Sequence, residues 1–157
     1  MENLYGISIS DFNEKIYFLN KKSNFNYDIF MKNILSINKK LKNSAVLTDY
    51  ITKNIDFKLM DSLINSKFKV KISILGDIII ILLYDITIDL YFLNQINQRL
   101  IEALYNITKT KKIKIDMLLR RFNDITLILD DTLHLMDPRI RLSGKIENMN
   151  FNDVVQV

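Results

Sequence analysis

Asp130, Asp131 and His134 form the one grouping in the sequence that suggests catalysis. On a helix, spacings of three and four residues bring His134 within reach of either carboxylate. A general acid/base pair has this composition. However, no nucleophile or set of metal ligands accompanies the three residues, and a histidine near the C-terminal end of a helix also interacts favourably with the helix dipole. We therefore expect a solvent-facing helix end and no catalytic residue in this grouping.

Three aspartates in the middle of the chain, Asp77, Asp85 and Asp89, could instead supply carboxylates to a hard metal ion. Apolar residues separate them and a calcium-loop glycine is missing, so turn and helix-cap roles fit the pattern better. The chain has no cysteine and one histidine, which excludes thiolate zinc sites and sites that need two imidazoles. Its three glycines are far apart, so a glycine-rich phosphate loop is also missing. We expect no metal and no cofactor.

The densest group of basic residues lies between two segments that we predict below to be helical. It consists of Lys109, Lys111, Lys112, Lys114, Arg120 and Arg121. Each basic residue near an anionic membrane contributes about 1 kcal/mol of binding free energy, so the four lysines are possible contacts for acidic lipid headgroups. Nucleic acid is a second polyanion that this group could bind. No aromatic residue that could stack on bases lies among the lysines, so we expect no nucleic-acid partner. A solvated connector would have the same composition.

The composition indicates one globular domain. The chain has 157 residues, of which 48% are hydrophobic and 25% charged, and its net charge is +4. Its longest apolar run, Ile78–Tyr84, is far shorter than the about 20 residues of a membrane-spanning helix. The N-terminal residues do not resemble a signal peptide, and the absence of cysteine fits a reducing compartment. We expect a soluble, intracellular protein with a domain over residues 1–142 and a short polar tail over residues 143–157.

Five segments are predicted to be extended. They are Leu4–Ser10, Lys15–Asn20, Phe57–Asn65, Lys67–Ile74 and Ile78–Tyr84. The first and fourth alternate between apolar and polar residues, which is typical of a strand with one buried face. Ile78–Tyr84 is continuously apolar and rich in β-branched residues, which predicts a central strand buried on both faces. Turn residues at Asp11–Glu14 indicate that the first two strands form a hairpin.

Three segments have the apolar spacing of three and four residues that is typical of helices. They are Asn26–Leu41, Leu93–Ile107 and Ile115–Leu133, and Thr87 or Asp89 lies near the start of the second. Pro138 should end the third helix, because proline lacks a backbone donor and clashes with the preceding turn. Residues between the first helix and the third strand, Lys42–Ile55, are weakly periodic and predicted to be mostly loop.

The third helix has more apolar residues than one buried face requires. Leu119, Leu127, Ile128 and Leu135 widen its apolar stripe. Such a surplus suggests a second buried face, and hence a partner protein, although packing against the preceding helix could also account for it. We therefore treat these four residues as a possible partner interface.

The predicted order is strand, strand, helix, three strands, helix, helix. A five-stranded antiparallel sheet of this size must cover its apolar faces. We expect an α+β sandwich in which the first helix covers one face and the two C-terminal helices cover the other.

Several local segments are distinctive within this order. They are Phe30–Ile34, Ile78–Tyr84, Lys111–Leu119, Asp130–Asp131 and Asp137–Pro138. Together with the element order, they resemble the longin (profilin-like) fold and, within it, coatomer zeta subunits and the sigma chains of clathrin adaptors. The first segment is similar to a phenylalanine-x-lysine-asparagine-isoleucine segment of the family's first helix. The third is similar to the basic connector and leucine pair that open its last helix. The match covers roughly residues 4–140.

The resemblance implies a non-catalytic small subunit of a vesicle coat or adaptor complex. Its partner would be a large solenoid subunit similar to gamma-coatomer, and the complex would act in Golgi-to-endoplasmic-reticulum transport. The protein would then be cytoplasmic and peripherally bound to Golgi or vesicle membranes. Three alternatives stay open. They are a sedlin-like longin subunit of a tethering complex, a small basic domain that binds lipid or nucleic acid, and a small hydrolase or nucleotide-dependent enzyme that uses Asp130, Asp131 and His134.

Overall fold

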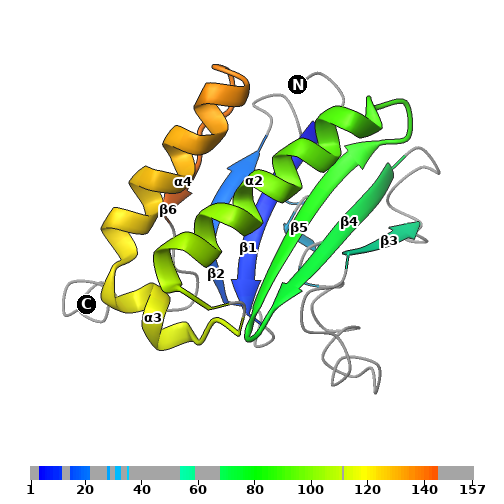
Figure 1. The fold of residues 1–157 in the computed structure, drawn as a ribbon. Coiled ribbons are helices and arrows are strands. Elements are labelled where there is room, and N and C mark those ends of the chain that lie inside the picture. The colour runs from blue at the N-terminus through cyan, green and yellow to red at the C-terminus, as the bar shows by residue number, and fades with distance from the viewer. Residues whose placement is uncertain are drawn as a thin grey trace.

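The computed structural model describes residues 4–11, 15–21, 28, 31, 32, 35, 54–58, 68–110 and 112–144. Within these residues, three helices cover one face of a six-stranded sheet, whose strand order is β3-β4-β5-β1-β2-β6 (Figure 1). Neighbouring strands are antiparallel throughout. The strands are β1 Leu4–Asp11, β2 Ile16–Lys21, β3 Asn54–Lys58, β4 Phe68–Leu75, β5 Ile78–Asp85 and β6 Ser143–Gly144. The helices are α2 Leu90–Thr108, α3 Ile115–Arg120 and α4 Phe122–Met136.

Strand β5 is the centre of the sheet, as its continuous apolar run predicts. It pairs with β1 on one side and β4 on the other, and every one of its side chains is buried. Ile80 and Leu82 join the core that includes α2 and α4. Ile79 and Ile81, which alternate with them, are buried on the opposite face. Both faces of the sheet are therefore shielded from water along β5.

The β1–β2 hairpin is closed by Asp11. The Asp11 amide donates to the carbonyl of Lys15, and the Asp11 carboxylate accepts from the Lys15 amide, both at 3.0 Å. The Tyr17 hydroxyl donates to the other carboxylate oxygen at 2.9 Å. Burial, followed by this hydrogen bond to Asp11, raises the pKa of Tyr17 above its ordinary value. The predicted hairpin is confirmed, although residues 12–14 of its turn lie outside the described residues.

The β4–β5 turn at Gly76–Asp77 holds the connector between α2 and α3. Gly76 has φ of 63°, and a Cβ atom at this position would lie 2.5 Å from the backbone nitrogen of Ile113. The Asp77 amide donates to the carbonyl of Ile113 at 2.8 Å. Because the Ile113 side chain is fully buried, the connector is fixed to the end of the hairpin. Only glycine combines this backbone conformation with this close approach.

The second predicted helix is confirmed as α2, but the predicted single helix over Ile115–Leu133 is wrong. The chain forms α3 and α4, separated at Arg121, whose backbone is not helical. The apolar spacing continues through the break, since Leu118 on α3 and Phe122 on α4 are both buried. Periodicity therefore gives no sign of the change in helix axis. Helix α4 ends at Met136, where the downstream Pro138 predicts its end.

The sheet has one strand more than predicted. Ser143 and Gly144, which we placed in the polar tail, pair with Leu19 and Phe18 of β2. A Cβ atom at Gly144 would lie 2.5 Å from the Thr126 hydroxyl oxygen, so β6 approaches α4 very closely. The rest of the expected tail, residues 145–157, lies outside the described residues.

Fewer of the predicted elements can be compared with the structure in the N-terminal half, because fewer of its residues are described. Within the first predicted helix, Asn26–Leu41, the four described positions 28, 31, 32 and 35 are helical. The remainder of that helix, and hence its place against the sheet, lies outside the described residues. Strand β3 begins at Asn54, inside the predicted loop and before the predicted strand Phe57–Asn65. Of these two predicted segments, residues 42–53 and 59–65 lie outside the described residues.

Candidate functional site

The structure gives the grouping of Asp130, Asp131 and His134 a role in holding the C-terminal segment. One Asp130 oxygen accepts from the Leu142 amide at 2.7 Å, and the other forms an ion pair with Arg141 at 3.1 Å. The Nε2 atom of His134 lies 3.4 Å from a guanidinium nitrogen of the same Arg141. Asp131 is exposed. His134 was predicted to approach a carboxylate. In the structure, His134 and Asp130 instead both contact Arg141.

The central aspartates have the turn and cap roles that their pattern favours. Asp89 is the N-cap of α2 and accepts from the Tyr91 amide at 2.9 Å. Asp85 accepts from the Thr87 amide and hydroxyl, and from the Tyr5 hydroxyl at 3.0 Å. Burial and then this hydrogen bond raise the pKa of Tyr5. Among the described residues, no group of three or more carboxylates or histidines is arranged to hold a metal ion.

The four residues of the possible partner interface are not equally exposed. Leu119 is partly buried and packs against the core, which explains its apolar character without a partner. Leu127, Ile128 and Leu135 on α4 are 64%, 38% and 87% exposed. The core side of α4 is already formed by Phe122, Ile125, Leu129 and Leu133. The packing of α4 on the core therefore does not require the three exposed residues.

A second exposed apolar group lies at the junction of β5 and α2. It consists of Ile86, Leu90 and Tyr91, which are 49%, 60% and 73% exposed. We did not predict this group. The sequence contained a signal for this group. Asp89 caps α2, so the apolar residues Leu90 and Tyr91 lie in the first turn of the helix, before Leu93, which is the first residue of α2 in the core.

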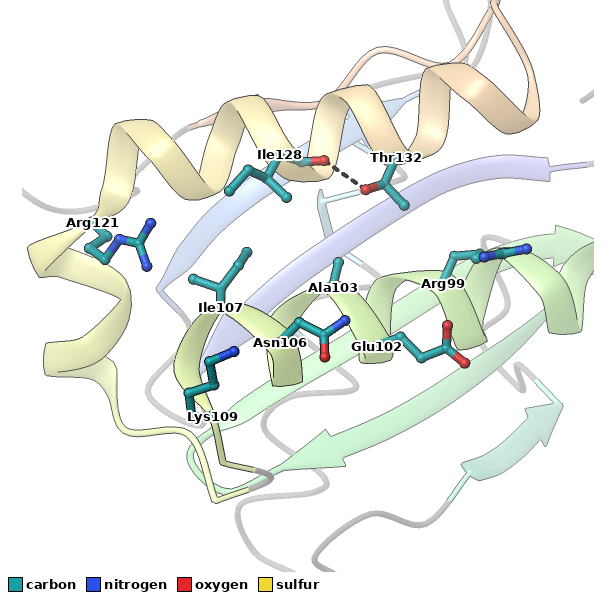
Figure 2. Close-up of a pocket in the computed structure, with 9 residues that line it drawn as sticks. All are labelled: Arg99, Glu102, Ala103, Asn106, Ile107, Lys109, Arg121, Ile128 and Thr132. Carbon is teal, nitrogen blue, oxygen red and sulfur yellow. Dashed lines mark hydrogen bonds between the residues drawn. The ribbon is translucent and has the colours of Figure 1, made fainter.

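A groove with a volume of about 590 Å³ runs between α2 and α4 (Figure 2). It is lined by Arg99, Glu102, Ala103, Asn106, Ile107, Lys109, Arg121, Ile128 and Thr132. Spacings of three and four residues place the α2 members on one flank of that helix, and Ile128 and Thr132 on the facing flank of α4. The Thr132 hydroxyl donates to the Ile128 carbonyl at 2.7 Å. Its apolar lining residues are Ala103 and Ile107 on α2 and Ile128 on α4.

One end of the groove is basic. Lys109, which ends α2 in a left-handed backbone conformation, and Arg121, at the break between α3 and α4, lie on opposite sides of this end. Arg121 lies 3.7 Å from Asp124, but both side chains are more than half exposed, so this ion pair is weak. Arg99 and Glu102 lie towards the other end.

The predicted basic cluster is divided by the structure. Lys109 lines the groove, whereas Lys112 and Lys114 are exposed on the connector on either side of the buried Ile113. Lys111 lies outside the described residues. The groove therefore brings together two members of the predicted basic cluster, Lys109 and Arg121, and one residue expected at a partner interface, Ile128. It also includes Arg99, Glu102 and Asn106, which the sequence did not single out.

No family model matches the chain, and neither does any curated protein. In the part of the chain that the structure describes, none of the helices combines the length and the apolar character needed to cross a bilayer. The features of the molecule that bear on function are its architecture, the exposed apolar residues of α4 and the groove beside them.

Proposed function

We propose that this protein is a non-catalytic small subunit of a vesicle coat or adaptor complex, similar to coatomer zeta, that docks on a large solenoid subunit. The complex would carry it to Golgi or vesicle membranes. The order of described elements supports this proposal, since two strands, three strands and then C-terminal helices on one sheet face are what the longin resemblance implies.

The observation that carries the proposal is the exposure of Leu127 and Leu135 on α4. Their exposed fractions, 64% and 87%, are large for leucines on a helix whose core side is complete. Burying apolar surface against another protein contributes roughly 25 cal/mol per Å² before the entropic costs of association. Ile128, 38% exposed on the same helix, extends this apolar surface towards α2.

Co-purification of the tagged full-length protein from its native cell, followed by mass identification, tests the proposal. We expect large solenoid coat chains to be recovered with it. The double variant Leu127→Asp/Leu135→Asp should reduce their recovery at least about tenfold, since it buries two charges at the interface. Because both positions are exposed, its thermal unfolding should stay close to that of the wild type.

A matched control introduces the same charges elsewhere on the helical layer. Asn94 on α2 and Asn123 on α4 are both exposed, and the double variant Asn94→Asp/Asn123→Asp should retain the partner. Recovery of other small tethering subunits in place of a solenoid chain would support the sedlin-like alternative. Equal recovery with both double variants would show that the α4 leucines do not form the interface.

A further inference from the structure

We propose that the connector between α2 and α3, together with the exposed side of α3, binds the surface of an anionic lipid bilayer. The contact consists of four exposed side chains, which we call the connector platform: Lys112, Lys114, Met117 and Arg120. None of them lines the groove between α2 and α4. The inference goes beyond the proposed coat function and does not depend on it, because it rests on residues that the leucine surface of α4 does not include.

The connector platform is held in place by the β4–β5 hairpin. The Asp77 amide donates to the Ile113 carbonyl at 2.8 Å, and the Ile113 side chain is fully buried. Lys112 and Lys114 stand on either side of this buried residue, so their backbone is fixed while both side chains are exposed. Figure 1 shows the connector and α3 at one end of the helical layer, beside the β4–β5 turn. The basic side chains are therefore presented together at one end of the described part of the molecule.

The positive charge of the platform is not neutralised within the described part of the chain. There, the side chains of Lys112, Lys114 and Arg120 make no hydrogen bond or ion pair with another residue. Asp116 is the one acidic residue of the connector and α3. Exposed cations interact with the negative potential of a membrane over a Debye length, which is about 8 Å at physiological salt. Three neighbouring cations on a fixed backbone therefore favour a surface of many negative charges.

Met117 adds an apolar side chain to the platform. It is 37% exposed and lies on α3, three residues from both Lys114 and Arg120. The next residue, Leu118, is fully buried and packs on the core, so the exposed Met117 is not needed for that packing. At a bilayer surface, an apolar side chain can reach the acyl chains while long basic side chains keep their charges at the headgroups. A methionine between basic residues has this combination.

These features favour a bilayer over nucleic acid, which is also a polyanion that attracts basic residues. From Lys109 to Arg121 the sequence has no aromatic residue that could stack on bases. An exposed methionine also gains little from a sugar–phosphate backbone, whereas a bilayer offers apolar contact directly beside its anionic charge. The basic residues Lys109 and Arg121 adjoin the platform and add to its attraction for anionic headgroups.

Co-sedimentation of the full-length protein with lipid vesicles tests the inference. The vesicles contain phosphatidylcholine alone, or phosphatidylcholine with about 30% phosphatidylserine. We expect the protein to sediment with the phosphatidylserine vesicles and to remain in solution with the others. Raising the salt concentration from about 0.1 M to about 0.5 M should release the protein, because the Debye length becomes shorter.

A double variant locates the contact on the molecule. Lys112→Glu/Lys114→Glu should lower the affinity for phosphatidylserine vesicles at least about tenfold. The control Lys32→Glu/Arg99→Glu makes the same charge change at exposed positions outside the platform, and it should lower the affinity much less. Because all four positions are exposed, both double variants should unfold thermally close to the wild type.

A single tryptophan reports on the position of Met117. The chain has no tryptophan, so Met117→Trp places the sole indole ring on the platform. Its fluorescence should shift to shorter wavelength when phosphatidylserine vesicles are added, because indole rings settle at the membrane–water interface. Asn94→Trp, at an exposed position near the other end of α2, is the matched control and should show no shift.

The inference is overturned if the protein does not bind phosphatidylserine vesicles, or if it binds pure phosphatidylcholine vesicles equally well. It is also overturned if the control double variant loses as much affinity as the platform variant, or if Met117→Trp shows no shift while the vesicles bind. Tighter binding of single-stranded RNA than of vesicles would identify a nucleic-acid surface instead. Release from the vesicles by millimolar inorganic phosphate at constant ionic strength would identify a site for a free anion. The coat proposal is tested separately, because Leu127→Asp/Leu135→Asp should leave vesicle binding unchanged.

Discussion

The two flanks of α4 differ in how their polar groups are used. On one flank, Asp130 binds the Leu142 amide and Arg141, and Thr126 lies against Gly144. On the other, Ile128 and Thr132 face α2 across an open groove. We call these the sealed flank and the open flank.

The difference follows from what lies beside each flank. A strand that contains glycine can approach a helix closely, and its backbone donors then require a partner such as Asp130. Two helices pack with their axes about 8–10 Å apart, so small residues such as Ala103 leave volume between them. The sealed flank therefore contributes to stability, whereas the open flank leaves space beside Ile128 and Thr132.

Replacing Phe122 should have the largest effect on the sealed flank. Its ring stacks on Phe18 of β2, with centroids 5.2 Å apart, and it lies against Gly144. We expect Phe122→Ala to lower the free energy of unfolding by about 4 kcal/mol in urea denaturation. The exposed Leu127→Ala is the control and should change it by less than about 0.5 kcal/mol. Similar values for the two variants would contradict the distinction between core and exposed positions on α4.

Removing the Asp130 carboxylate should have the next largest effect. Asp130→Ala leaves the Leu142 amide without its partner and breaks the ion pair with Arg141, so we expect a loss of about 2 kcal/mol. Hydrogen exchange at the Leu142 amide should accelerate in this variant. Asp131→Ala, at the exposed neighbouring position, should leave both stability and exchange unchanged. Unchanged Leu142 exchange in Asp130→Ala would show that the carboxylate does not hold the C-terminal segment.

Acid should weaken the start of the same C-terminal segment. Hydrogen bonds from the Arg139 side chain to Asp137, which follows α4, lower the pKa of Asp137 from 3.8 to about 2. Because the folded-state pKa is the lower one, the stabilisation is complete above about pH 4 and is lost as the pH falls towards 2. Arg139 is 62% exposed, so solvent screening limits the effect to about 1 kcal/mol. Asp137→Asn should remove this part of the pH dependence of urea unfolding; an unaltered pH profile would refute the assignment.

The open flank should respond least to substitution. The Thr132 hydroxyl bonds only locally, to the Ile128 carbonyl one turn earlier. Thr132→Ala should therefore change the free energy of unfolding by less than about 0.5 kcal/mol in thermal or urea denaturation. A loss comparable to that of Asp130→Ala would mean that α2 and α4 are closed against each other in solution.

Much of the described fold could be predicted from the sequence because single elements carry their own signals. Alternation identified β1 and β4 as strands, but its prediction of a single buried face is wrong, because Ser8, Ser10 and Ser73 are buried as well. The β-branched run identified β5, and Asp89 was one of two residues proposed near the start of α2. Strand β6 could not be predicted, because two small residues have no period and their pairing with β2 is a long-range contact.

The groove escaped prediction for a related reason. Arg99, Glu102 and Asn106 have the spacing of an ordinary solvated helix face. Their common environment depends on the separation between α2 and α4, and on the break at Arg121 that sets the direction of α4. Residue spacing within one helix contains no information about either.

The contact of Gly76 and Asp77 with Ile113 has a consequence for recognition. It fixes the connector that leads from Lys109 to Arg121, so the two walls of the groove at this end are attached to the same β-hairpin. Any ligand of this groove would meet walls that are already in place, so little conformational freedom of the protein would be lost on binding.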